Sequence, residues 1–102
     1  MSDKITNNIT LDLNDDGKGA FYFENNGERI GEMVISTDKS NLTVYHTEVS
    51  PEMEGKGIAR SMVDTMTDYA RDHHLKVVPL CPYVHAQFKR HPELYNDIWK
   101  KD

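Results

Sequence analysis

Hydrophobic and polar residues alternate along the first half of the chain with the period of two that is typical of β-strands. Short turns rich in Asn, Asp and Gly separate the alternating segments, as in β-hairpins. We therefore predict four strands joined as an antiparallel meander. They lie at residues 5–13, 20–23, 29–36 and 42–49.

In the last of these strands, strict alternation assigns neighbouring residues to opposite faces. One predicted face carries Leu42, Val44, His46 and Glu48, and the other carries Thr43, Tyr45, Thr47 and Val49. His46 and Glu48 are candidate general bases, acting directly or through water. The alternative for His46 is a satisfied, partly buried side chain, and the alternative for Glu48 is a solvated sheet edge.

The hydrophobic period then changes. From Ile58 it is that of an amphipathic helix, which we expect to run to about His73. Residues 75–80 follow as a short apolar run rich in Val, which is consistent with a buried strand. A strand, a crossover helix and another strand over residues 42–80 predict one parallel pair in the sheet.

The end of the chain reads as two short helices. Pro82 suits the first position of a helix, with Cys81 before it, and Pro92 begins a last helix that we expect to reach Trp99. The predicted order is β-β-β-β-α-β-α. The fold class is therefore α+β, with a mostly antiparallel twisted sheet and one parallel β-α-β crossover.

Composition indicates an ordinary soluble globular protein, with 37% hydrophobic and 28% charged residues. A length of 102 residues favours one domain over residues 1–102. The formal net charge of −5 argues against general nucleic-acid binding, which rests on Lys and Arg. We expect no membrane association, because no apolar run could span a bilayer. The single cysteine, Cys81, and the lack of a secretory signal favour a reducing, cytoplasmic setting.

The turn Glu54-Gly55-Lys56-Gly57-Ile58-Ala59 joins the fourth strand to the long helix. Two glycines separated by one residue let the backbone turn tightly and approach a ligand closely. The N–H groups of the first helical turn lack internal partners and, with the helix dipole, attract an anion. Lys56 and Arg60 add positive charge. The alternative is a connecting loop whose glycines serve only the turn.

Residues 49–59, followed by Met62 and Val63, resemble the acetyl-CoA-binding signature Q/R-x-x-G-x-G/A of the GNAT acetyltransferase superfamily. The matching positions are Glu54, Gly57 and Ala59, and Glu54 departs from the usual Gln or Arg. The resemblance covers roughly residues 30–92. The stretch Cys81-Pro82-Tyr83-Val84 resembles the C-P-Y-V stretch of the minimal, single-domain branch of that superfamily.

This resemblance implies a GNAT-like fold, acetyl-CoA or coenzyme A as ligand, and N-acetyl transfer to an amine of a protein or a small molecule. It places Val49 at the pantetheine arm. It places Gly55, Lys56, Gly57, Ile58 and Ala59 at the pyrophosphate. Further cofactor-binding candidates are Arg60, Tyr83, Lys89, Arg90 and His91. The basic group at residues 89–91 either touches the 3′-phosphate and adenine or is a plain solvated face, and Tyr83 either reaches the thioester or packs.

Cys81 has two interpretations. At the start of a helix its thiolate would be stabilised, which suits nucleophilic chemistry. A free cysteine is also commonly a small buried apolar residue. The family resemblance favours a role near the acyl thioester, as nucleophile or as acid to the leaving thiolate. Direct attack of the amine on the thioester, helped by a base, is the other route.

A non-catalytic module that binds or senses coenzyme A is the alternative function. Such a module would keep the glycine turn and lose the reactive side chains at Cys81 and His46. We expect no metal site, because no Cys/His cluster appears at ligand spacing. An exposed edge strand at Leu11 or Phe21 would allow a weak homodimer, and a monomer is the other possibility.

Overall fold

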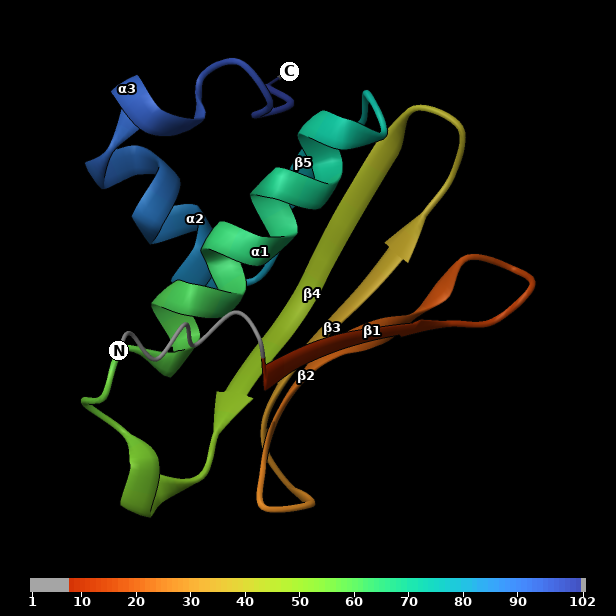
Figure 1. Cartoon of the computed structure of the whole chain (residues 1–102). Coiled ribbons are helices and arrows are strands. Elements are labelled where there is room, and N and C mark those ends of the chain that lie inside the picture. The colour runs from red at the N-terminus through yellow and green to blue at the C-terminus, as the bar shows by residue number, and fades with distance from the viewer. Residues whose placement is uncertain (1–7, 102) are drawn as a thin grey trace.

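The computed structural model describes residues 8–101, which form a mixed sheet with helices gathered on one side of it (Figure 1). Within this range the sheet has five strands in the order β1-β2-β3-β4-β5. They are β1 (Ile9–Leu13), β2 (Lys18–Asn25), β3 (Glu28–Thr37), β4 (Asn41–Val49) and β5 (Lys76–Pro79). The predicted α+β class is confirmed. Ile5, where the first predicted strand begins, lies outside the described residues.

Three α-helices and one short 3-10 helix follow β4 in the described chain. They are η2 (Pro51–Met53), α1 (Ile58–Asp72), α2 (Pro82–Arg90) and α3 (Pro92–Tyr95). The longest, α1, has 15 residues. Among the helices of residues 8–101, none is long and apolar enough to cross a membrane.

The prediction that the last helix reaches Trp99 is wrong, because α3 ends at Tyr95. The chain instead turns and runs beside β5. The Val77 N–H donates to the Ile98 carbonyl at 2.6 Å, and the Lys100 N–H donates to the Val77 carbonyl at 2.9 Å. Backbone pairing with an edge strand therefore replaces the last helical turn.

Strand β5 is short, and this opens the sheet. It pairs in parallel with β4 only from Asn41↔Lys76 to Val44↔Pro79. Beyond that point the Cys81 N–H donates to the Val44 carbonyl at 2.9 Å, and the chain enters α2. Strand β4 runs on to Val49. The second half of β4 therefore diverges from the path of β5.

A β-bulge lies in β4 at Tyr45. In the pairing with β3, Ile35 faces Val44 and Val34 faces His46, so Tyr45 is the extra residue. Its hydroxyl lies 2.8 Å from the hydroxyl of Ser36. An extra residue shifts the alternation of all that follow.

The predicted faces of β4 are therefore wrong beyond Val44. Leu42 and Val44 are buried against the helices, but His46 and Glu48 are exposed. Glu48 pairs with Glu32, and His46 pairs with Val34, on the outer face of the sheet. Thr47 and Val49 take the helix side instead, where they pair with Met33 and Gly31.

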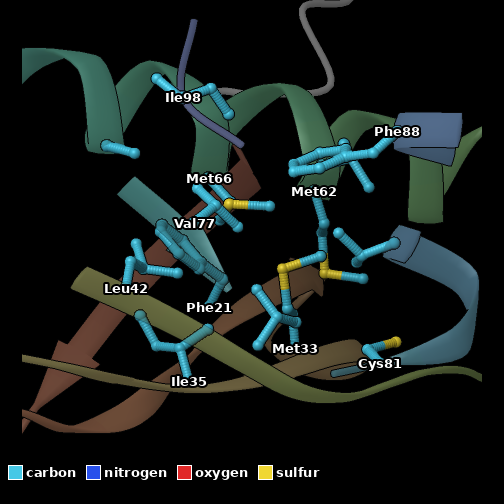
Figure 2. Close-up of a cluster of buried hydrophobic side chains, with 14 of the residues drawn as sticks. Phe21, Met33, Ile35, Leu42, Met62, Met66, Val77, Cys81, Phe88 and Ile98 are labelled. Carbon is cyan, nitrogen blue, oxygen red and sulfur yellow. The ribbon is translucent and has the colours of Figure 1, made fainter. Parts of the chain in front are cut away.

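The core lies between the sheet and the stripe of α1 that carries Ile58, Met62, Val63, Met66, Thr67 and Ala70. Figure 2 shows Met62 pointing toward Met33 of the sheet, with Phe88 of α2 beside α1. Fully burying a large apolar side chain such as Met33, Met62 or Phe88 contributes about 1.5–3 kcal/mol to the stability of the fold. The predicted helix is confirmed.

Gly31 lets the start of α1 approach the sheet closely. A Cβ at this position would lie 3.1 Å from the Met62 Cε and 3.3 Å from an Ile58 methyl group. A larger residue would push the first turn of α1 away from β3. The sheet therefore fixes the position of the glycine turn that precedes Ile58.

Arg71 joins α1 to the segment after α3. Its Nε donates to the Asp97 carboxylate at 2.9 Å, and its guanidinium also donates to the Leu94 carbonyl at 2.6 Å. The hydrogen bond from Arg71 holds the pKa of Asp97 below its ordinary value. The pair therefore stabilises the fold above that ordinary value, and its contribution is lost as the pH falls through the lowered pKa.

Candidate functional site

A cleft of about 500 Å³ lies where β4 diverges from β5. It is bounded by the end of β4, η2, the glycine turn, the first turn of α1 and the start of α2. The lining residues are Thr47, Val49, Met53, Glu54, Gly55, Gly57, Ile58, Ala59, Arg60 and Tyr83. The predicted turn and the strand before it therefore form one concave surface.

The glycine turn has the backbone of an anion site. Gly55 and Gly57 have φ angles of +83° and +79°, a region that only glycine adopts readily. A Cβ at either position would meet no atom of the described chain within 4 Å, so the space beside both is open. A phosphate group could therefore approach the backbone without steric hindrance.

The first amides of α1 are available to such a group. Gly57 is the N-cap, and no side chain of the described residues caps the helix. The first intrahelical bond is donated by the Ser61 N–H to the Gly57 carbonyl at 3.0 Å. The N–H groups before Ser61 thus lie ahead of the first helical bond. These residues fit the pyrophosphate that the sequence implied.

Seven of the predicted cofactor-binding residues line the cleft: Val49, Gly55, Gly57, Ile58, Ala59, Arg60 and Tyr83. The other four, Lys56, Lys89, Arg90 and His91, are not among the described residues that line it. Lys56 lies exposed between the two glycines, and residues 89–91 lie at the far end of α2. Residues 89–91 would therefore act on an anionic ligand mainly through long-range attraction, whereas Lys56 lies within the turn whose glycines line the cleft.

Thr47 and Met53 also line the cleft, and neither was predicted from the sequence to belong to the site. Thr47 could have been found, because it shares a strand face with Val49 in both the predicted and the observed alternation. Met53 could not have been predicted, because it belongs to the short helix η2, and no hydrophobic periodicity in the sequence indicates that helix.

Cys81 lies directly behind the cleft wall. It is the N-cap of α2, and it is 2% exposed. Its Sγ lies 3.3 Å from Oγ1 of Thr47, which does line the cleft. Its burial suits the structural interpretation, and its contact with Thr47 suits a functional one.

Arg60 and Tyr83 form the wall on the helix side. Nε of Arg60 lies 3.6 Å from an oxygen of Asp64, one helical turn further along α1. Burial raises the pKa of Tyr83 above its ordinary value, and the positive charge of Arg60 partly opposes this. Tyr83 is therefore a neutral hydroxyl at physiological pH, able to donate or accept a hydrogen bond.

The structure does not bring His46 and Glu48 to the same surface as Cys81. Their side chains lie 3.6 Å apart and are 55% and 70% exposed. They project from the outer face of β4, whereas Thr47 and Val49 project into the cleft. No group of three or more His, Cys, Asp or Glu side chains able to hold a metal occurs in the described part of the chain.

Comparison with known protein families identifies the class of protein to which the chain belongs. The family model of the GCN5-related N-acetyl-transferases matches residues 20–98. The chain belongs to this family of N-acetyltransferases. The family implies acetyl-CoA as donor and an amine as acceptor. A comparison with curated proteins gives no match.

Solved structures share the fold. A GCN5-like putative N-acetyltransferase from Staphylococcus aureus has a TM-score of 0.68 and 20% identity, over 93% of this chain and 91% of that one. The ribosomal-protein-alanine N-acetyltransferase from Brucella melitensis biovar Abortus 2308 has a TM-score of 0.60 and 22% identity, over 86% of this chain and 69% of that one. The ribosomal-protein-S18-alanine N-acetyltransferase from Escherichia coli has a TM-score of 0.64 and 13% identity, over 79% of this chain and 54% of that one.

Replacing Glu54 with glutamine should strengthen binding of coenzyme A. Glu54 lines the cleft, and its negative charge opposes an anionic ligand at the turn. Removing one such surface charge should lower the Kd by about two- to fivefold at low salt, and less as salt screens the charge. Isothermal calorimetry at two salt concentrations measures this. Glu52→Gln, an exposed neighbour that is not among the described lining residues, is the control and should change little.

Proposed function

We propose that the cleft binds acetyl-CoA, with the pyrophosphate on the amides of the glycine turn and the pantetheine arm along β4 beside Val49. The observation that carries this proposal is the open, uncapped turn, in which both glycines border the cleft. Arg60 adds a positive charge at the same wall. The divergence of β4 from β5 supports the placement of the arm, because it frees the strand edge beyond Val44 for hydrogen bonds.

We further propose that Cys81 takes part in acetyl transfer to an amine. In one route the amine nitrogen bonds to the acetyl carbon as the C–S bond breaks, and the Cys81 thiol supplies the proton to the leaving thiolate. In the other, the Cys81 thiolate attacks the acetyl carbon and coenzyme A leaves as its thiolate; the amine then attacks the new thioester, and the Cys81 thiolate leaves. The contact with Thr47 supports either role, since it joins the sulfur to the cleft wall.

His46 and Glu48 remain our candidates for the base that takes the proton from the amine. Because they project from the outer face of β4, a base there would serve an acceptor that arrives from the side opposite the cleft. The acceptor is an amine of a protein or a small molecule. The comparisons do not support the alternative of a non-catalytic binding module. We also propose that the chain forms a single domain, that it works in a reducing, cytoplasmic setting, and that it is a monomer or a weak homodimer.

Intact-mass analysis with acetyl-CoA tests the function and the role of Cys81 together. Wild type and Cys81→Ala are each incubated with acetyl-CoA and a panel of amines, and thiol release is followed. Wild type should release thiol with an amine, and Cys81→Ala should be at least about tenfold slower. An acetyl group carried by wild type but not by Cys81→Ala would select the covalent route.

Equal turnover by the two proteins would remove Cys81 from the mechanism and leave the acetyltransferase assignment intact. No binding of millimolar acetyl-CoA by wild type would contradict the proposed cofactor site itself. Binding is therefore measured first, by calorimetry, on both proteins.

A further inference from the structure

Tyr95 of α3 carries a buried hydroxyl that has no hydrogen-bond partner in residues 8–101. The residue is 2% exposed. A buried hydroxyl without a partner destabilises the folded state, and phenylalanine would fill the same space without that penalty. Such a group calls for a physical explanation.

The position of the Tyr95 ring is fixed by its packing. The ring stacks on Phe88 of α2, with centroids 4.6 Å apart and planes inclined by 22°. On its other side Tyr95 borders a hollow that Asp64 and Thr67 of α1 also line. The ring therefore spans from α2 to the part of α1 that carries Asp64 and Thr67.

Arg60 lies beside this hollow, because its Nε is 3.6 Å from the carboxylate of Asp64, which lines the hollow with Tyr95. Its guanidinium is close enough to the Tyr95 hydroxyl to lower that group's pKa, although burial has the larger effect and raises it. The buried Nε of Arg60 also lacks a hydrogen-bond partner within the described chain, and Asp64 is 3.6 Å away. A neutral phenol oxygen and a carboxylate thus flank a guanidinium whose N–H groups are donors.

Arg60 lines the cleft as well, so it connects the cleft with α3. A free arginine side chain loses conformational entropy when a ligand fixes it. A hydrogen bond that the arginine gains in the bound state offsets part of this loss. Nε of Arg60 and Oη of Tyr95 have no partner in residues 8–101, so the two side chains have groups available for such a bond.

We propose that Tyr95 is a positioning residue that holds Arg60 against the anionic part of acetyl-CoA. When acetyl-CoA binds, an N–H of Arg60 donates to the Tyr95 hydroxyl, which has no partner within the described residues, while the remaining N–H groups face the ligand. The inference rests on the proposed function. It extends the cofactor site to α3, a helix with no residue among those described as lining the cleft.

Tyr95→Phe removes the hydroxyl and keeps the ring. The Kd for coenzyme A, measured by calorimetry, should rise about three- to tenfold. The KM for acetyl-CoA should rise in parallel with kcat unchanged. Stability toward urea should stay the same or increase, because the unpartnered hydroxyl is gone. Tyr69→Phe, on the part of α1 that packs edge-on against Phe21, is the matched control and should leave the Kd unchanged.

Two further measurements separate positioning from general packing. In an Arg60→Ala background, Tyr95→Phe should add no further loss of affinity, since the group it holds is absent. Acetyl-pantetheine, a donor without the pyrophosphate and nucleotide, should have the same KM with wild type and Tyr95→Phe.

An unchanged Kd for Tyr95→Phe would overturn the proposal, and so would an equal loss in the Arg60→Ala background or with acetyl-pantetheine. Failure of the proposed function is distinguishable from these outcomes. In that case wild type itself would show no binding of coenzyme A, whereas here wild type binds and only the comparison between variants fails.

Discussion

Gly57→Glu should abolish binding of acetyl-CoA and coenzyme A. Gly57 has a φ of +79°, so any other residue strains the backbone by roughly 1–2 kcal/mol. Its side chain would also enter the open space beside the turn and place a carboxylate where the pyrophosphate is proposed to bind. Wild type with ligand at 100 times its Kd should gain about 2.7 kcal/mol of stability. For a small domain this is a rise in Tm on the order of 10 °C or more, and Gly57→Glu should show none of it.

Gly27→Glu is the control. Gly27 has a φ of +81°, and a Cβ there would also meet no described atom within 4 Å. It lies in the hairpin between β2 and β3, away from the cleft. This variant should lose similar stability and keep the full ligand-induced rise in Tm. A rise that survives in Gly57→Glu would show that the turn is not the phosphate site.

Phe88→Ala should be the most destabilising single substitution that we describe. The side chain is 0% exposed, and its ring packs on Tyr95 and, at 5.7 Å, edge-on against Trp99. Truncating a buried phenylalanine costs about 3–5 kcal/mol. Total stabilities of such domains are about 5–15 kcal/mol, so a large part of the folded state's margin is lost. Urea unfolding followed by circular dichroism measures the change.

Leu94→Ala provides the comparison on α3, because Leu94 is 44% exposed. It should change the free energy of unfolding by about 0.5 kcal/mol or less. Equal losses in the two variants would mean that α2 and α3 do not share the core described here. Since the Tyr95 ring rests on Phe88, Phe88→Ala should in addition weaken binding of coenzyme A at temperatures where it remains folded.

The order of the elements could be predicted because each has a local signal. Alternation marks the strands, the stripe from Ile58 to Ala70 marks α1, and Pro82 and Pro92 mark the helix starts. The bulge at Tyr45 has no such signal. Tyrosine is an ordinary strand residue, and the extra position exists only in the pairing with β3. The faces assigned to His46 and Glu48 were wrong for that reason.

Some residues of the candidate site could likewise be predicted from the sequence, and others could not. The residues of the turn and Val49 lie within one segment of eleven residues, 49–59, so their meeting at one cleft follows from the motif alone. The basic residues Lys89 and Arg90 follow Tyr83 on α2 but are not among the described residues that line the cleft, although the charge of Arg90 acts on Tyr83. The proximity of Tyr95 to Arg60 depends on how α3 packs on α1, and no periodicity encodes that packing.

The bulge in β4 has a consequence for how related chains are aligned. Deleting Tyr45 alone would restore simple alternation and leave residues 46 to 49 on the surfaces they occupy now, because His46 would still pair with Val34. Two relatives that differ only by this residue would present the same residues to the same sides of the sheet, although alternation counted from the start of the strand assigns them to opposite sides. An alignment of this strand must therefore place its gap at the bulge before any residue is assigned to the donor or the acceptor side.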